Sequence, residues 1–359
     1  MISQFEDIYK GKTVLVTGHT GFKGSWLCLW LKELGAKVIG YALLPQTNPN
    51  HIDLLNLNIT SITGNIKNPD KLDAIFKKYK PEIVFHLAAQ PLVRYSYLNP
   101  VETFETNVMG TINIFETCRN TKSVKAIINI TSDKCYANKE WVWGYREIDP
   151  MGGFDPYSAS KGCSELVTVS YRNSFFTGNT LLASTRAGNV IGGGDWAEDR
   201  IVPDIMKAVN IKEKVLIRNP EATRPWQYVL EPLSGYLLLG QKLLEGKKEF
   251  SDAWNFGPKD ENNVKVETLV KNFKKHWNKI DYKIKINKNN PHEAGFLKLD
   301  WSKALLKMKW MPNWDFNKTI EMTVKWYKEF YENKKIISLY TLNEYIKDAE
   351  SKNLEWIKK

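Results

Sequence analysis

A glycine-rich turn between an apolar run and a helical pattern constrains the fold of this chain more than any other feature. Residues 12–17 read KTVLVT, a short run rich in β-branched side chains, and the turn GHTGFKG follows directly. Apolar side chains then recur at helical spacing from Trp26 to Leu34, and a second apolar run occupies residues 37–41. Strand, glycine turn, helix and strand is the order of the first β-α-β unit of a dinucleotide-binding fold.

The three glycines of the turn have separate roles in such a unit. Gly18, Gly21 and Gly24 permit the tight turn, the close approach of backbone to a pyrophosphate, and close helix packing. The helix N-terminus then faces the phosphates. The spacing G-x-x-G-x-x-G differs from the commoner G-x-G-x-x-G, so the assignment depends on the strand and helix around it. The turn residues expected to contact the cofactor are Gly18, Thr20, Gly21, Phe22, Lys23 and Gly24.

The second strand does not indicate which dinucleotide is bound. Its end reads Tyr41-Ala42-Leu43-Leu44, with no Asp or Glu for a ribose diol and no arginine pair for a 2′-phosphate. The choice between NAD and NADP stays open on this evidence, and we favour NAD.

Strands and helices continue to alternate along the first half of the chain. Expected strands are 59–64, 83–86, 126–131 and 181–186, and expected helices are 69–79, capped by Asn68, 100–119, and one that begins near Tyr157. This alternation predicts an α/β fold with a doubly wound parallel sheet of Rossmann type.

The pattern changes after residue 187. Glycine-rich and polar loops surround short strands at 215–217 and 253–256 and a helix at 231–245, and the chain becomes helical and lysine-rich from residue 264, ending in helices at 317–331 and 342–357. We expect a smaller mixed α/β C-terminal substrate lobe. The predicted division is a NAD-binding domain at 1–187, with about 228–258 returning to it, and a lobe formed by about 188–227 and 259–359.

The densest set of proton-transfer groups lies between residues 130 and 161. Tyr157 and Lys161 are four residues apart on a predicted helix, so they share one face. At ~5 Å and an effective dielectric of ~20, the ammonium would stabilise the phenolate by about 3 kcal/mol, which lowers the tyrosine pKa by roughly 2 to 2.5 units. Thr131, Asp133 and Lys134 arrive at the end of the preceding strand, where open α/β sheets bind ligands.

Composition excludes several other classes of protein. The net charge is +11, but the lysine excess is scattered and accompanies no recognised nucleic-acid motif, so we expect no nucleic-acid partner. No apolar run reaches the length of a membrane span and the N-terminus lacks a signal-peptide core, which predicts a cytoplasmic protein without a membrane partner. The four cysteines show no C-x-x-C pairing, which predicts free thiols and no metal site.

Several motifs in fixed order resemble one enzyme family. GHTGFKG, HLAAQ, ETNVMGT, TSDKCY, YSASK and RAGNVIGGGDW are similar to the extended short-chain dehydrogenases/reductases that act on nucleotide sugars. Longer runs, including TSDKCYANKEWVWGYRE and STRAGNVIGGGDWAEDR, resemble the branch of that family that removes water from CDP-glucose. The resemblance implies a tightly held NAD, a CDP-hexose substrate such as CDP-glucose, and a product with a ketone at C4 and a methyl group at C6, for deoxysugar biosynthesis. It also implies a homodimer or homotetramer built through a face that includes the Tyr157 helix.

The resemblance implies these catalytic roles. Tyr157, supported by Lys161, takes the proton of the sugar 4-hydroxyl, and Thr131 hydrogen-bonds the 4-oxygen. Asp133, kept protonated by burial, donates a proton to the departing 6-hydroxyl. Lys134 stands where related dehydratases have an acid, and it is either the C5 base or an electrostatic clamp on the enolate.

The resemblance also assigns binding residues. The further cofactor contacts are Asn65, Ile66, Ala88, Ala89, Asn107, Tyr157 and Lys161. Asn65 replaces the aspartate with which the family contacts adenine. The substrate contacts are Gln90, Arg94, Ser132, Asn189, Arg200, Arg218 and Arg224. Arginine suits a diphosphate because its guanidinium forms paired hydrogen bonds to phosphate oxygens.

Three alternatives remain at this stage. A nucleotide-sugar 4-epimerase needs Tyr157, Lys161 and a hydroxyl, but it has no use for an acid at C6, so Asp133 discriminates against it. A dehydratase of another nucleotide hexose would differ in the base-binding residues. A non-catalytic NAD-binding protein would have no reason to keep these groups together.

Overall fold

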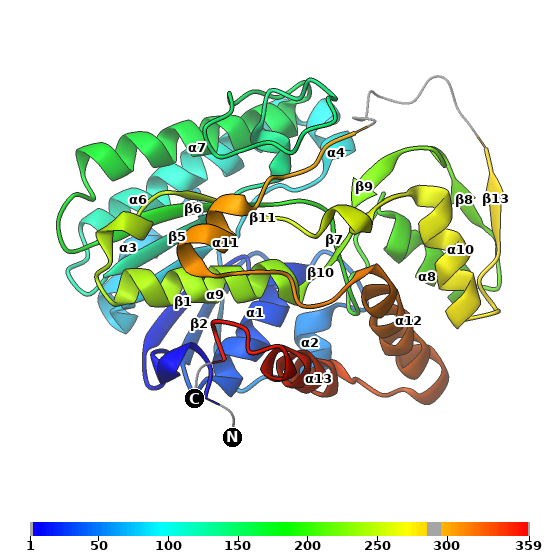
Figure 1. The fold of residues 1–359 in the computed structure, drawn as a ribbon. Coiled ribbons are helices and arrows are strands. Elements are labelled where there is room, and N and C mark those ends of the chain that lie inside the picture. The colour runs from blue at the N-terminus through cyan, green and yellow to red at the C-terminus, as the bar shows by residue number, and fades with distance from the viewer. Residues whose placement is uncertain (1–2, 286–295, 358–359) are drawn as a thin grey trace.

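A seven-stranded parallel sheet forms the centre of the computed structural model, which describes residues 3–285 and 296–357 (Figure 1). The strand order is β11-β6-β5-β4-β1-β2-β3. The strands are β1 (Thr13–Thr17), β2 (Lys37–Ala42), β3 (Thr60–Thr63), β4 (Ile83–His86), β5 (Ala126–Ile130), β6 (Leu181–Ala187) and β11 (Ala253–Phe256). The order reverses between β1 and β4, and ligands of such sheets bind at that switch point. The expected fold class is confirmed.

Helices cover both faces of the sheet because successive side chains of each strand point to opposite sides. Val14 and Val16 of β1 belong to the core shared with α1 (Phe22–Glu33) and α9 (Leu230–Leu244). Leu15 belongs to the core on the other face, beneath α3 (Pro69–Tyr79) and α6 (Gly110–Arg119), and α7 (Pro156–Ser174) lies on this same side (Figure 1). Asn68 caps α3 as expected, accepting from the N–H of Lys71 at 3.0 Å.

The helix expected at residues 100–119 is interrupted. It consists of α5 (Pro100–Phe104), a π-helical turn at Glu105–Met109, and α6. The turn places the side chain of Asn107 against the loop after β4 and against α7, where it forms hydrogen bonds that a regular helix of this sequence would not reach. Two short helices precede it on the sheet domain, α2 (His51–Leu55) and α4 (Val93–Leu98).

The second lobe is built from small paired strands and helices. Its strand pairs are β7 (Val190–Ile191) with β10 (Gln227–Tyr228), β9 (Thr223–Pro225) with β12 (Asn263–Lys265), and β8 (Val215–Ile217) with β13 (Tyr282–Ile284), and its helices include α8 (Ile201–Asn210) and α10 (Val266–His276). The stretch 218–229, expected to be a polar loop, therefore contains two strands, because partners distant in sequence satisfy its backbone groups.

The C-terminal segment departs from the predicted division of the chain. It contains α11 (Ser302–Met308), α12 (Phe316–Asn333) and α13 (Ser338–Ser351). Trp356 stacks on Phe5 with ring centroids 5.4 Å apart, and Tyr345 of α13 contacts Trp30 of α1. α13 therefore packs on the sheet domain below α1 and α2 (Figure 1), and not in the lobe expected to include residues 259–359. Long-range aromatic contacts of this kind leave no local sequence signal. Among the described helices, none has the length and apolarity needed to cross a bilayer.

Candidate active site

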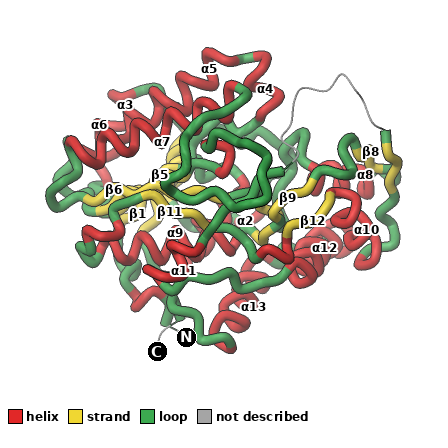
Figure 2. The backbone as a smooth tube through the Cα atoms, turned by 45° about the horizontal axis from the view of Figure 1, so that its top comes forward, coloured by secondary structure: helices red, strands yellow, loops and turns green. Residues whose placement is uncertain are grey.

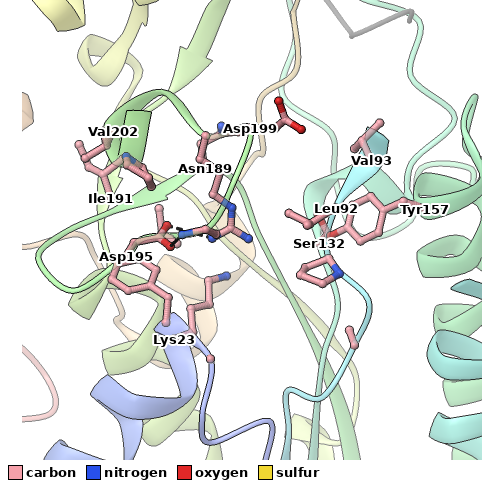
Figure 3. Close-up of a pocket in the computed structure, with 18 of the residues that line it drawn as sticks. Lys23, Leu92, Val93, Ser132, Tyr157, Asn189, Ile191, Asp195, Asp199 and Val202 are labelled. Atoms are coloured by element: carbon pink, nitrogen blue, oxygen red, sulfur yellow. Dashed lines mark hydrogen bonds and ion pairs between the residues drawn. The ribbon is translucent and has the colours of Figure 1, made fainter. Parts of the chain in front are cut away.

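A cavity of about 830 Å³ opens along the carboxyl ends of the sheet strands, between the sheet and the second lobe. Its wall includes the glycine turn, the segments after β4, β5 and β6, the helix α8, and the chain between β8 and β9. Figure 3 shows Tyr157 and Ser132 on one side, Asn189, Ile191 and Asp195 on the other, and Lys23 entering from α1. This is the size and position expected of a small-molecule site in an α/β fold.

The first turn of α7 holds Tyr157 in the cavity. Pro156 begins the helix, and the carboxylate of Asp155 caps it by accepting from the N–H of Ser158 at 2.9 Å and from the Ser158 hydroxyl at 2.6 Å. The N–H of Tyr157 donates to the hydroxyl of Ser96 at 3.1 Å. The backbone of Tyr157 is thereby tied to α4, and the residue is 8% exposed.

The pKa of Tyr157 does not follow the expectation from sequence. Burial raises it to about 12, while a hydrogen bond with Ser132 and the charge of Arg200 act in the opposite direction. Lys161, whose own pKa burial lowers to about 8, donates to the carbonyl of Ile130 at 3.4 Å. The predicted lowering of the Tyr157 pKa by Lys161 is therefore wrong for the chain alone, because desolvation of the phenolate outweighs the nearby cations.

The two hydroxyls that follow β5 face different surroundings. The hydroxyl of Thr131 donates to Oε1 of buried Glu165 at 2.5 Å and lies 3.1 Å from the carbonyl of Thr185. The Ser132 hydroxyl lies close enough to Tyr157 to lower the pKa of that phenol, and it donates to Oδ1 of Asp133 at 3.0 Å. Both residues line the cavity, but the Thr131 hydroxyl is directed to Glu165 behind the site, whereas the Ser132 hydroxyl is directed to Asp133 on the cavity wall.

Asp133 and Lys134 begin a single 3-10 turn, Asp133–Cys135, directly after β5. Asp133 is 3% exposed, and burial raises its pKa, opposed first by Lys134 and then by the Ser132 hydrogen bond. This is the direction expected for a carboxyl group that must stay protonated. Lys134 is half-buried and lines the cavity.

A buried ion pair behind the site has no counterpart in the sequence predictions. Glu165 of α7 and Arg186 of β6 are 2.7 Å apart, with side chains 1% and 3% exposed. Glu165 also accepts from Thr131 and from Ser184, the latter at 2.8 Å, and Arg186 donates to the hydroxyl of Tyr136 at 2.6 Å. The pair joins α7 to β5 and β6. An arginine inside an apolar strand was the one signal that could have indicated it.

The glycine turn has the shape of a dinucleotide cradle. Gly18 has a φ of +73°, and a Cβ there would lie 2.7 Å from the N of Ala88. A Cβ on Gly24 would lie 2.2 Å from the carbonyl oxygen of Gly18, whereas the nearest atom to one on Gly21 is 3.4 Å away. Lys23 projects into the cavity, and burial lowers its pKa to about 8. The residues present therefore fit a diphosphate at this turn.

The other expected cofactor contacts divide into two groups. The structure places on the cavity wall Thr20, Phe22, Asn65, Ile66, Ala88, Ala89 and Lys161. Asn107 does not belong there. Its amide bonds the backbone of Gln90 and the hydroxyl of Ser160 at 2.8 to 3.0 Å, and it is 2% exposed. It is a structural crosslink between the β4 loop and α7.

Gln90 also differs from its expected role in substrate binding. Its side-chain amide forms hydrogen bonds with the backbone of Leu92 and donates to the hydroxyl of Thr103 at 2.9 Å. Sequence reasoning instead missed the cavity residues after β2, namely Gln46, Thr47 and Asn50. They follow the end of β2, where the acid expected to bind the ribose is missing. The missing acid was the signal that other residues of this loop could line the cavity.

Six substrate candidates do line the cavity: Arg94, Ser132, Asn189, Arg200, Arg218 and Arg224. Arg200 donates to Oδ2 of Asp195 at 3.0 Å. The guanidinium of Arg218 lies 2.8 Å from Oδ1 of Asp199, and that of Arg94 lies 3.6 Å from the same oxygen. The cavity wall thus carries guanidinium groups, which suit a diphosphate, and Arg94, Arg200 and Arg218 are each already paired with Asp195 or Asp199.

The described residues contain no cluster of three or more His, Cys, Asp and Glu side chains that could hold a metal ion. All four cysteines are free thiols, as expected.

Comparison with known proteins adds family and activity information. A family model described as GDP-mannose 4,6-dehydratase matches residues 15–323. The CDP-glucose 4,6-dehydratase of Salmonella typhimurium is 52% identical over 331 residues, which cover 90% of this chain and 92% of that one. The dTDP-D-glucose 4,6-dehydratase of Dictyostelium discoideum is 30% identical over 267 residues, 70% of this chain and 59% of that one.

Solved structures show the same fold at low identity. The UDP-glucose 4-epimerase of Thermotoga maritima superposes with a TM-score of 0.77 at 24% identity, covering 88% of this chain and 99% of that one. The dTDP-glucose 4,6-dehydratase of Bacillus anthracis, in complex with NAD, gives a TM-score of 0.74 at 19% identity, covering 90% and 98%.

Proposed function

The chain belongs to the nucleotide-sugar dehydratase family of extended short-chain dehydrogenases/reductases, and on that premise we propose that it converts CDP-glucose to CDP-4-dehydro-6-deoxyglucose and water. The 52% identity to an enzyme of this activity supports the assignment over almost the full length of both chains. Oxidation at C4, loss of water across C5 and C6, and reduction at C6 make up the reaction.

The structural observation that supports this function most directly is the position of Asp133. It is a buried carboxyl group with a raised pKa, and it accepts a hydrogen bond from Ser132, the residue beside Tyr157. A protonated acid beside the oxidation site can give its proton to a leaving 6-hydroxyl. A 4-epimerase forms no such leaving group and has no step that needs this acid.

The cofactor we propose is NAD. The glycine turn and Lys23 would hold its diphosphate, Asn65 and Ile66 its adenine, and Tyr157 with Lys161 its nicotinamide ribose. When bound, NAD takes a hydride from the sugar and returns it later in the cycle. Among the described residues the wall after β2 offers Gln46, Thr47 and Asn50 but no arginine, which favours NAD over a cofactor with a 2′-phosphate.

The first step assigned to the chain itself is removal of a proton from the sugar 4-hydroxyl. Tyr157 takes this proton as its phenolate, and a pKa of about 12 in the chain alone means that Lys161 and the bound cofactor must supply the remaining stabilisation. Ser132, and not Thr131, would hydrogen-bond the 4-oxygen, because its hydroxyl is the one beside Tyr157.

The second step removes water. A ketone at C4 makes the C5 proton acidic, and Lys134 is the group on the cavity wall that we assign to accept it, while Asp133 protonates the 6-hydroxyl. A Lys134→Ala variant tests the base: loss of solvent deuterium exchange at C5 supports the assignment. Exchange that persists would leave Lys134 the role of an electrostatic clamp on the enolate.

We further propose that two chains associate through α4, α5 and α7. These helices lie side by side on one side of the molecule, remote from α12 and α13 (Figure 2). They expose a set of large apolar side chains, namely Leu98 at 80%, Val101 at 70%, Phe104 at 37%, Leu166 at 60% and Val169 at 39%. Large apolar side chains exposed on adjacent helices favour a protein interface, and a self-complementary one gives a dimer. Monomeric protein in light scattering at micromolar concentration would contradict it.

The deciding experiment for the reaction uses CDP-glucose that bears deuterium at C4. The purified chain with NAD is expected to give a product with the label at C6, followed by NMR. Recovery of unchanged sugar, or of sugar inverted at C4, would overturn the proposed function.

A further inference from the structure

The cavity has a third region that neither the proposed cofactor site nor the reacting groups occupy. The glycine turn and Tyr157 supply parts of its wall that the cofactor and the hexose would occupy, while α8 and the chain after β8 supply a further part. If the hexose lies at Tyr157 and the diphosphate at Arg200 and Arg224, the nucleobase must extend toward α8 and β8. This placement rests on the proposed function.

The side chains at this end suit a flat heterocycle with a polar edge. Val202, Pro203, Leu216 and Ile217 supply apolar wall, and Asp204 and Arg218 supply the nearby charged groups. Asp204 lies in the first turn of α8, where its N–H donates to the carbonyl of Arg200 at 2.9 Å. The same helical segment therefore contributes both Arg200, for the diphosphate, and Asp204, for the base.

Asp204 is less engaged in ion pairs within the protein than the other described carboxylates at this end of the cavity. Its Oδ2 lies 3.9 Å from Arg218, beyond hydrogen-bond distance, and its side chain is 29% exposed. Asp199 is paired with Arg218 at 2.8 Å, and Glu221 is 67% exposed and paired with Lys265 at 2.5 Å. Among the carboxylates that the structure describes at this end, Asp204 is the one placed to accept from a base.

We propose that Asp204 accepts a hydrogen bond from the exocyclic amino group of cytosine and thereby selects cytidine nucleotides over uridine and thymidine nucleotides. The base edge of cytosine carries the N4 amino donor beside the N3 and O2 acceptors, so a carboxylate with a neighbouring guanidinium complements it. Uracil and thymine place the O4 acceptor where cytosine has its amino group. That oxygen would face the carboxylate without a proton between them, which leaves both groups unsatisfied.

The experiment compares Asp204→Asn with the parent chain, using CDP-glucose and UDP-glucose as substrates in the presence of NAD. Asparagine keeps the size of the side chain but replaces the charged acceptor with a neutral amide, which accepts more weakly from cytosine and can donate to the O4 of uracil. We expect kcat/KM for CDP-glucose to fall by about 10- to 100-fold, mainly through KM, and kcat/KM for UDP-glucose to stay within about threefold or to rise. Glu221→Gln is the matched control at the same cavity end and should change neither value by more than about twofold.

Binding of CDP and of UDP by calorimetry separates this inference from the proposed reaction. If the parent chain binds CDP more tightly than UDP and Asp204→Asn removes the difference, the role of Asp204 holds even if no dehydration is observed. An equal loss of affinity for both nucleotides, or an unchanged ratio in a variant with the parent's melting temperature, would overturn it.

Discussion

Thr131 and Glu165 are joined by a 2.5 Å hydrogen bond that points away from the cavity, and this bond decides which hydroxyl is available for chemistry. The carboxylate is held in turn by Arg186, with its guanidinium nitrogen at 2.7 Å. The next residue, Ser132, is the one that contacts Tyr157 and Asp133. We therefore expect Thr131 to have a structural role and Ser132 a functional one.

Replacing each hydroxyl separately tests this division. We expect Ser132→Ala to lower kcat by about 10²- to 10³-fold with little change in melting temperature, because it removes a hydrogen bond to the reacting oxygen and to Tyr157. Thr131→Val keeps the shape of the side chain, so kcat should stay within about threefold, while stability falls by about 1–3 kcal/mol because Glu165 loses a buried donor. Steady-state kinetics and urea unfolding measure both variants. A larger loss of kcat in Thr131→Val than in Ser132→Ala would reverse the assignment.

Asp133 is expected to act in the elimination and not in the oxidation. Asp133→Asn should lower dehydration of CDP-glucose by about 10²- to 10⁴-fold, because an amide cannot protonate the 6-hydroxyl. Fluoride needs less help from an acid to leave than hydroxide does, so a substrate with fluorine in place of that hydroxyl should restore much of the rate. The measurement is product formation from each substrate by NMR. Equal losses with both leaving groups would show that Asp133 is needed at another step.

From the buried ion pair of Glu165 and Arg186 we predict a change in the free energy of unfolding. Glu165→Gln leaves the guanidinium of Arg186 without its partner at a site where both side chains are nearly inaccessible to water. Loss of one member of such a pair costs about 3–5 kcal/mol of unfolding free energy. The double variant Glu165→Gln with Arg186→Met removes the uncompensated charge and should recover part of the loss. Urea denaturation of the three proteins gives the values, and a double variant less stable than Glu165→Gln alone would contradict the argument.

Local patterns predicted the sheet well because its strands are apolar, short and separated by regular helices. The same reasoning failed where the direction of one side chain, or a contact between residues distant in sequence, decides the role of a residue. Thr131 and Ser132 are both plausible hydroxyls, and only their directions at the end of β5 distinguish them. Asn107 was assigned to the cofactor, but the π-helical turn directs its amide to Gln90 and Ser160.

The C-terminal helix illustrates the second kind of failure. Its amphipathic pattern indicates a buried face but not the surface that covers it. The carboxylate of Glu231 in α9 accepts the N–H groups of Asn313 and Trp314 at 2.7 and 2.8 Å and the hydroxyl of Tyr345 at 2.9 Å. These contacts span 82 to 114 residues of sequence, so no local window includes both partners.

The pH dependence of cofactor binding should report Lys23. Burial lowers its pKa to about 8 in the chain alone, so the ammonium is charged below that pH and neutral above it. A bound diphosphate favours the charged form and raises the pKa in the complex, so binding above about pH 8 takes up a proton and the association constant falls by about tenfold per pH unit. Lys23→Arg stays charged throughout and should bind NAD with a flatter profile, whereas Lys23→Gln should bind weakly at every pH. Titration of NAD against protein fluorescence from about pH 7 to about pH 9.5 measures the three profiles. An unchanged slope in Lys23→Arg would assign the dependence to another group, of which Lys161, with a pKa also near 8, is the first to test.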